Sequence, residues 1–313
     1  MLDNLVISIE AVFPMFIMMA IGAVLRKRNM LNDGEINRVN KIVFKVFFPV
    51  TLFSNLYGKD ISEAINIKLM LFGAGTVLLI FILAFTYVVK TEKDNKTRGA
   101  MIQAIFRSNF IIMGMPVVAN MFGSENVGVT AIMITVIIPL YNILAVITLE
   151  YFRGRNANIG KVIVEVLKNP LIIGCLSGIF ALIVDFKLPT VLERVVESLS
   201  TVGSPLAIIL LGASFSWGTL ASEKRSLIKC VVGRLFIAPC IGISGGILLG
   251  FRGVELATLV AIFAAPSAIT SFTMAQQMDS NYELAGSAVV VSSVVSCATL
   301  FAWIFALRSF GLL

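Results

Sequence analysis

Stretches of about 20 mostly apolar residues recur along the chain, and short polar segments separate them. An apolar stretch of this length is what an α-helix needs to cross the hydrocarbon core of a bilayer. We therefore predict an all-α integral membrane protein with ten transmembrane helices. The expected spans are Val6–Leu25, Val39–Tyr57, Leu69–Val89, Gly99–Phe122, Gly128–Tyr151, Leu171–Asp185, Leu199–Trp217, Leu227–Gly250, Val254–Met278 and Leu284–Leu307.

Two of the ten spans carry features that interrupt a helix. The segment Arg107–Gly123 contains a guanidinium, an amide and a Gly-Met-Pro sequence, so we expect its helix to open near Gly114–Pro116. Inside a membrane, an open helix is tolerated only where protein or a water-filled cavity meets its free backbone groups. A second such segment, Ala264–Gln277, contains Pro266 and several hydroxyl residues. Each alone could be a kinked packing helix, but the pair indicates a transporter binding site.

The composition supports a membrane protein and excludes several chemistries. Of 313 residues, 58% are hydrophobic and only 14% charged, whereas a soluble domain averages about 25% charged residues. The chain has no histidine, which excludes histidine metal sites, Ser-His-Asp catalysis and histidine proton relays. Its four cysteines stand singly in apolar runs, as packing residues do. Asp3 precedes the first apolar run, which lacks a basic leader and is expected to be a retained span.

The net charge of +7 follows the membrane and does not indicate a nucleic-acid partner. Basic residues concentrate in alternate loops, and the positive-inside rule then places both termini outside the cytoplasm and the Arg153–Lys168 linker inside it. We expect a multi-pass protein of the cell (plasma) membrane. The loops assigned to the cytoplasm hold Arg26, Lys27, Arg28, Arg38, Lys41, Lys90, Lys93, Lys96, Arg98, Arg153, Arg155, Lys161, Lys168, Lys224, Arg225 and Lys229.

The two halves of the chain share spaced landmarks. One pair of prolines in each half is separated by 35 residues, and an Arg-Gly pair opens both the fourth and the ninth span. Matched spacing, matched interruptions and an odd number of spans per half predict two inverted five-helix repeats, residues 1–152 and 169–313, joined by the linker 153–168. The broken helices 4 and 9 are expected to cross. The landmarks are Pro14 and Pro49, Pro170 and Pro205, Arg98-Gly99 and Arg252-Gly253.

Several stretches resemble the auxin efflux carrier family, which includes plant auxin exporters and bacterial malate or malonate permeases. The segment Asn109-Phe-Ile-Ile-Met-Gly-Met-Pro116 is similar to the family's Asn-x-x-x-Met-Gly-x-Pro crossover helix. The resemblance covers nearly the whole chain, although Ser271 stands where the family often has a second proline. Other similar stretches are Glu35–Arg38, Phe48-Pro49, Glu150–Gly154, Lys168–Pro170, Arg234, Pro239, Ala264–Phe272 and Gln276.

The resemblance implies ten helices in two inverted repeats, with helices 4 and 9 crossing near mid-membrane. It also implies that a core domain moves against a scaffold formed mainly by the first, second, sixth and seventh helices. The compact chain, which has no long cytoplasmic loop, is closest in form to the bacterial permeases of that family.

A buried carboxylate substrate needs groups that compensate for the water it loses. The N-termini of two half-helices supply N–H donors and partial positive charge, and Asn109 can add an amide donor. In an alternative interpretation Asn109 caps freed carbonyls and the hydroxyl residues serve helix packing. The expected substrate-binding residues are Arg107, Ser108, Asn109, Pro116, Pro266, Ser267, Thr270 and Ser271, with the two prolines shaping the gap.

Three basic residues, Lys45, Arg107 and Arg234, lie within spans, where a charge is a functional candidate. Arg107 is the strongest because it is two residues from Asn109 and could attract an anion. We expect Lys45 and Arg234 to lie at a cavity rim or toward lipid. Acidic residues such as Glu10 are confined to the ends of spans, so a carboxylate proton relay is not expected.

The sequence therefore predicts a secondary transporter of small organic anions, such as malate or malonate-like carboxylates, by alternating access through a mid-membrane site. Facilitated diffusion, anion exchange and gradient-driven uptake all remain open, as does a sodium site of backbone carbonyls and amides. An anion-conducting channel or a membrane sensor without transport is the alternative. We expect no enzymatic activity and no cofactor or metal site. The expected partners are the anion and membrane lipid; a homodimer is possible.

Overall fold

The computed structural model describes residues 2–58, 66–123, 127–153, 159–215, 218 and 222–313. In these ranges the fold is helical, and the prediction of an all-α protein is confirmed. The first half contains α1 (Leu2–Lys27), α2 (Asp33–Ile42), η1 (Val43–Phe47), α3 (Phe48–Ser54), α4 (Ile67–Thr91), α5 (Asn95–Phe106), η2 (Phe110–Gly114), α6 (Met115–Phe122) and α7 (Gly128–Arg153). The second contains α8 (Ile159–Lys168), α9 (Pro170–Ile183), α10 (Thr190–Ser214), α12 (Lys224–Val232), η4 (Gly233–Ile237), α13 (Ala238–Leu248), α14 (Gly253–Phe263), α15 (Thr270–Gln277) and α16 (Tyr282–Ser309).

Five helical segments among the described residues are long and apolar enough to cross a membrane unbroken. Shorter apolar helices match other expected spans, which are interrupted or short. The chain is thus a membrane protein with several apolar helices, and the count of ten spans stays a prediction. The five are Ile67–Thr91, Gly128–Arg153, Thr190–Ser214, Lys224–Leu248 and Tyr282–Ser309, and the shorter ones are Phe110–Phe122, Pro170–Ile183 and Gly253–Phe263.

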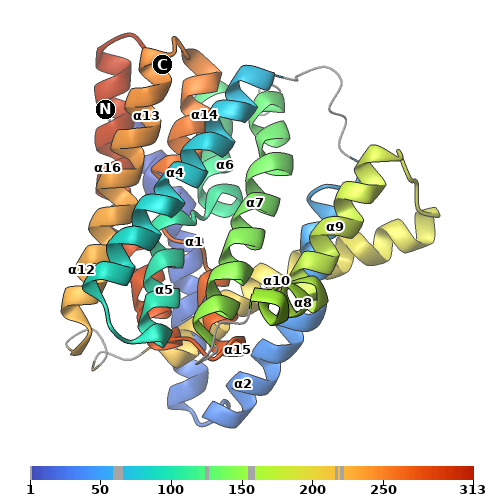
Figure 1. The fold of residues 1–313 in the computed structure, drawn as a ribbon. Coiled ribbons are helices and arrows are strands. Elements are labelled where there is room, and N and C mark those ends of the chain that lie inside the picture. Colours follow the sequence, from blue (N-terminus) through green and yellow to red (C-terminus); the bar gives the residue numbers. More distant parts are fainter. Residues whose placement is uncertain (1, 59–65, 124–126, 154–158, 216–217, 219–221) are drawn as a thin grey trace.

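The helices form two groups. In Figure 1, α4–α7 and α12–α16 make an upright bundle, and α9 stands to one side of it. Contacts join α1 with α10, α3 with α9 and α10 with α3, which makes these four segments the second group. These segments fall in the first, second, sixth and seventh expected spans, which are the helices that the family resemblance implies for a scaffold. The groups meet where α1 packs on α16 and α6, and where α9 packs on α7.

Two glycines let α1 and α10 approach backbone to backbone. A Cβ atom on Gly22 would overlap the carbonyl oxygen of Ile209, and one on Gly212 would overlap that of Met19. Helices pack this closely in membranes when small residues line the contact. The glycines therefore hold two segments of the second group against each other.

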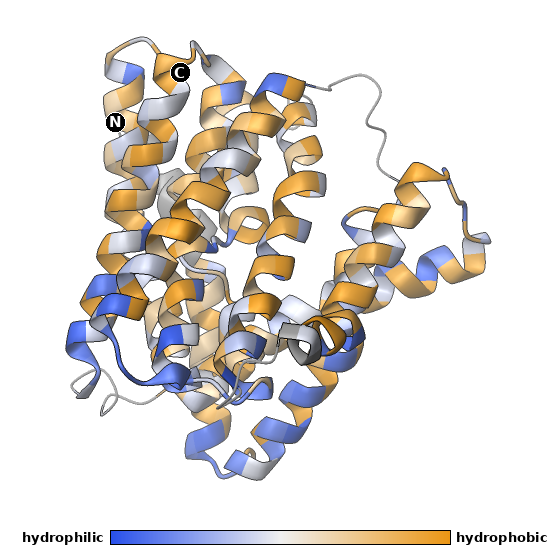
Figure 2. Ribbon diagram, viewed as in Figure 1, coloured by the Kyte–Doolittle hydropathy of each residue, from blue (hydrophilic) through white to orange (hydrophobic). Residues whose placement is uncertain are grey.

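Polar residues gather at one end of the molecule. Figure 2 shows hydrophilic residues at the end that carries α2 and the start of α12, and mostly apolar surface along the bundle. The N- and C-termini lie at the opposite end (Figure 1). At the polar end, the side chain of Asp94 caps α5 by accepting hydrogen bonds from the backbone and hydroxyl of Thr97, at 2.8 and 2.7 Å. Partial burial raises the pKa of Asp94, but these hydrogen bonds outweigh it and hold the pKa below its usual value.

Candidate functional site

Two interrupted helical segments meet inside the bundle. The first helix, α5, ends at Phe106, and its counterpart α14 ends at Phe263. Beyond these ends, Ser108 and Ser267 form an isolated antiparallel backbone bridge. The N–H of Asn109 donates to Pro266 at 2.8 Å, and the N–H of Ala268 donates to Arg107 at 3.3 Å. The two breaks thus supply each other's hydrogen bonds, as buried backbone requires.

The first helix opens seven residues earlier than the Gly114–Pro116 position that the sequence indicates. The chain is extended at Arg107, and the π-helix η2 follows before Pro116. Proline lacks an N–H and its ring crowds the carbonyl four residues before it, so a wider π-turn relieves the conflict without ending the helix. The π-helices η1 and η4 precede Pro49 and Pro239 in the same way.

The side chain of Arg234 contacts the C-terminal ends of both α5 and α14. Its side chain is fully buried, and its guanidinium donates to the carbonyls of Ile105 (3.4 Å), Phe106 (3.0 Å), Ile262 (3.1 Å) and Phe263. These are the last carbonyls of α5 and α14, where the helix dipole places partial negative charge. The prediction that Arg234 lies at a cavity rim or toward lipid is wrong, because these carbonyls supply the partners that let a charge remain inside.

Arg107 has a different environment. It is 4% exposed, and its guanidinium donates to Asn142 Oδ1 at 2.7 Å and to Met274 Sδ at 2.6 Å. Both acceptors are neutral, and no ion pair to Arg107 is present in the described part of the chain. A buried guanidinium without an anion carries a large desolvation cost. Its positive charge is therefore available to a ligand.

Asn109 contributes a second free donor. The side chain is 6% exposed, and its Nδ2 atom is buried without a hydrogen-bond partner among the described residues. A buried N–H group without a partner costs about 1–3 kcal/mol, so it is rare in a folded protein. Only a bound molecule or water in contact with Nδ2 would remove this cost.

The residues Arg107 and Asn109 line a cavity of about 100 Å³ at the crossing of the two segments. A volume of this kind accommodates several water-sized groups, which is the scale of a small organic molecule. The first residues of η2 also line it, so the N-terminal end of that half-helix faces the cavity while Arg234 covers the C-terminal ends of α5 and α14. The complete lining is Phe48, Thr51, Leu52, Asn55, Arg107, Ser108, Asn109, Phe110, Ile111, Ile112, Ile138, Tyr141, Asn142, Leu171, Ser204, Ala268 and Thr270.

The chain matches one protein-family model along nearly its whole length. Residues 7–161 and 153–304 match the model described as "Membrane transport protein". The chain belongs to this family of membrane transporters. The resemblance to the auxin efflux carrier family is thereby confirmed, since it is the same family.

Two relatives of this membrane transport protein carry names that bear on function. An "Uncharacterized transporter" of Methanothermobacter thermautotrophicus is 25% identical over 300 residues, which are 95% of this chain and 97% of the relative. A "Putative malonate transporter" of Rhizobium meliloti is 22% identical over 142 residues, which are 45% of this chain and 44% of the relative.

Four of the eight expected substrate-binding residues of the transporter line the cavity: Arg107, Ser108, Asn109 and Thr270. The other four lie around it. Pro116 borders a separate hollow with Pro14, Pro266 accepts the N–H of Asn109, the hydroxyl of Ser267 caps the carbonyl of Ala104 at 2.8 Å, and the Ser271 hydroxyl is buried without a partner among the described residues.

Sequence reasoning did not select the residues that face these donors from other helices. Tyr141 and Asn142 lie on α7, and the Tyr141 hydroxyl is 3.3 Å from that of Ser108. Thr51 comes from α3, Asn55 directly follows the end of α3, and Ser204 comes from α10. An amide within the apolar stretch Gly128–Tyr151 was a usable signal for Asn142, because polar residues inside a membrane span are functional candidates.

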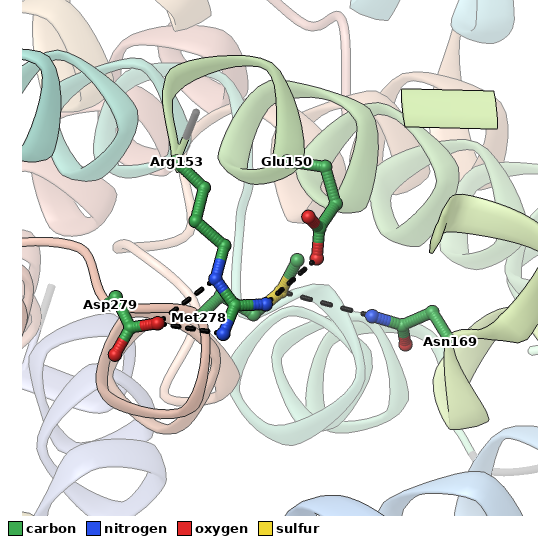
Figure 3. A network of polar contacts seen from close by, with 5 residues as sticks. All are labelled: Glu150, Arg153, Asn169, Met278 and Asp279. Atoms are coloured by element: carbon green, nitrogen blue, oxygen red, sulfur yellow. Dashed lines mark hydrogen bonds and ion pairs between the residues drawn. The ribbon is translucent and has the colours of Figure 1, made fainter. Parts of the chain in front are cut away.

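At the polar end of the transporter, the end of α15 is tied to its neighbours. Asn40 of α2 donates to Gln276, and Gln277 donates to Asn37 at 3.0 Å. Figure 3 shows the other side of this contact, where Arg153 lies between two acids and an amide faces Met278. The distances are 2.7 Å from Arg153 to Asp279, 3.4 Å from Arg153 to Glu150, and 3.8 Å from Asn169 Nδ2 to Met278 Sδ. The contacts of Asn37, Asn40 and Asn169 thus join the end of α15 to α2 and to the start of α9, whereas Arg153 joins the end of α15 to α7 within the bundle.

Proposed function

We propose that this protein is a secondary carrier of small organic anions, such as malate or malonate-like carboxylates, and that the anion binds in the crossing cavity. One observation carries the proposal: within the described residues, a buried guanidinium without an anionic partner and a buried amide without a partner belong to side chains that line the same cavity. The carboxylate would accept from Arg107 and from Nδ2 of Asn109. Ser108 and Thr270, which also line the cavity, would add hydroxyl donors.

The electrostatics of the crossing favour an anion over a cation. Arg234 neutralises the negative ends of α5 and α14, whereas the first residues of η2, at the positive end of that half-helix, line the cavity. The described cavity lining contains Arg107 and no carboxylate, so its net charge is positive. The name of the malonate-related relative is in line with this substrate class.

The proposal includes ten spans in two inverted five-helix repeats, residues 1–152 and 169–313, with the linker 153–168 between them. In each half the interrupted segment is the fourth of five. The antiparallel bridge between Ser108 and Ser267 supports opposite insertion, because equivalent points of the two halves run in opposite directions there. We place the termini outside the cytoplasm and the linker inside the cell, since the polar end carries the basic loops.

Transport would proceed by alternating access. The bundle that carries Arg107 and Asn109 would move against α1, α3, α9 and α10, of which α3, α9 and α10 line the other side of the cavity. The contacts of Asn37 and Asn40 with α15 would break when the polar end opens. In the present arrangement those contacts are made. We therefore assign this arrangement to a state closed toward the cytoplasm.

Uptake of radiolabelled malonate into proteoliposomes tests the carrier proposal. We expect saturable uptake that unlabelled malonate or malate competes away and that a neutral diamide of the same size does not. Protein-free liposomes and the Asn109→Ala variant serve as controls. Steady single-channel currents would instead indicate an anion channel. Binding of the acid without any uptake would indicate a sensor, and either result would overturn the proposal.

A further inference from the structure

A second cavity, larger than the crossing cavity, lies on the outside of the bundle, between α4 and α12–η4–α13. Its volume is about 590 Å³. The helix α4 packs on α5 and α13, while α12 packs on α5, so a groove remains between α4 and α12 with Ile105 of α5 at its floor. Small residues, Ala84 and Gly233, face it from the two walls.

The walls of this groove are apolar and accessible. The exposed fractions of Leu83, Ile228 and Ile237 are 46%, 51% and 52%. Two lysines stand on opposite walls, Lys90 in the last turn of α4 and Lys229 in the last turn of α12. No ion pair to either lysine is found within the described residues.

We propose that this groove binds one anionic phospholipid, with an acyl chain along the apolar walls and the phosphate between Lys90 and Lys229. Its length supports this occupant. From Lys90 to Ile80 the helix α4 rises about 15 Å, which is half of the roughly 30 Å hydrocarbon core. The groove thus spans one leaflet and carries its positive charge at the headgroup end, as sites for anionic lipids do between transmembrane helices.

The ring of Tyr87 positions the ammonium of Lys229 at the headgroup end of the groove. The Nζ atom of Lys229 lies 5.9 Å from the centre of this ring. The cation–π contact holds the ammonium at the mouth of the groove, and tyrosine is a residue that favours the membrane interface. A phosphate there would meet one positioned ammonium and the more exposed one of Lys90.

The floor of the groove touches the support of the crossing. Ile105 and Gly233 line the groove there, and they flank the contact in which Arg234 donates to the carbonyl of Ile105. An acyl chain in the groove would cover these residues and limit the separation of α5 from η4. We therefore expect the lipid to stabilise the fold. The inference stands apart from the substrate site, since none of the groove residues named here lines the crossing cavity.

Native mass spectrometry of the purified full chain, released from nanodiscs of equal phosphatidylglycerol and phosphatidylcholine, tests the site. We expect one phosphatidylglycerol to be retained in preference to phosphatidylcholine. In the K90Q/K229Q variant, its retention should fall about fivefold for each lysine lost. The matched control is K93Q/K96Q, which removes the exposed Lys93 of the α4–α5 loop and the exposed Lys96 in the first turn of α5, both outside the groove, and should retain the lipid.

A second variant tests the groove without removing charge, in case the loss of the two lysines disturbs folding. Leu83→Trp fills an exposed part of the groove wall and leaves both lysines in place. We expect it to lose bound lipid of both kinds and the increase in melting temperature that phosphatidylglycerol gives the unmodified protein. Equal retention of the two lipids, unchanged phosphatidylglycerol retention in K90Q/K229Q, equal loss in K93Q/K96Q, or a dimer that Leu83→Trp dissociates would each overturn the proposal.

Discussion

The backbone N–H of Asn109 donates to the carbonyl of Pro266 at 2.8 Å, across 157 residues of sequence. This hydrogen bond engages the main chain of Asn109 and leaves its side-chain Nδ2 without a partner among the described residues. The crossing of the two segments therefore holds an amide donor in place beside the buried charge of Arg107.

Asn109→Ala should strongly weaken substrate binding. A hydrogen bond to a charged group contributes about 1.5–3 kcal/mol, so the apparent affinity for malonate should fall about ten- to hundredfold. Because Nδ2 has no described partner in the ligand-free fold, the melting temperature should not fall. Asn120→Ala on α6, which lies outside the crossing cavity, is the matched control and should transport normally. Unchanged uptake by Asn109→Ala would remove this residue from the site.

Arg107→Met should separate stability from function. The substitution removes a buried charge that has only neutral partners, so the ligand-free protein should melt at the same or a higher temperature. Uptake should be lost because the cavity no longer carries a positive charge. Thermal melting with and without malonate, together with uptake, checks both parts. Retained uptake, or a large drop in melting temperature without ligand, would contradict the role assigned to Arg107.

Arg234→Met should have the opposite effect on stability. It leaves the carbonyls at the ends of α5 and α14 buried without donors, and removal of one partner of such a buried network costs about 3–5 kcal/mol. Arg234→Lys keeps the charge but cannot reach all four carbonyls. Its melting temperature should therefore lie between those of the unmodified protein and Arg234→Met. If Arg234→Met melts like the unmodified protein, the guanidinium is not what holds the crossing together.

Gly114→Ala should disturb the packing of η2 against α14. A Cβ atom there would lie 2.5 Å from the carbonyl oxygen of Ala261, which is too close for a backbone contact. The half-helix must shift, and both melting temperature and uptake should decrease. Gly75→Ala is the control, because a Cβ on this residue of α4 meets open space and alanine favours the helix. Equal behaviour of the two variants would argue against a close approach at Gly114.

A cross-link across the polar end should stop the transport cycle. The side-chain ends of Asn37 and Gln277 are hydrogen-bonded at 3.0 Å, so cysteines at these positions are within reach of a short bifunctional thiol reagent. In the Asn37→Cys/Gln277→Cys variant, a short bis-methanethiosulfonate cross-linker should abolish uptake and a reducing agent should restore it. The single-cysteine variants report any contribution from the four native cysteines. Full uptake after complete cross-linking would show that this end need not open.

Much of the architecture follows from the one-dimensional pattern. Apolar stretches of membrane length, basic loops and two interrupted segments are local features, and local features determine where a helix is stable in a bilayer. The two polar residues of the first break, Arg107 and Asn109, could be selected for the same reason: polar groups in an apolar span need a partner or a function. The family assignment agrees with this part of the interpretation.

Other features were decided by the tertiary structure. In the sequence, Arg234 is flanked by apolar residues, as a lipid-facing basic residue would be. Its carbonyl partners are 28, 29, 128 and 129 residues away along the chain. The helix ends at Phe106 and not at Gly114–Pro116 because the second break offers hydrogen bonds there, while a π-turn accommodates the proline. A sequence shows which groups need partners in the membrane; only the packed fold shows which distant groups meet that need.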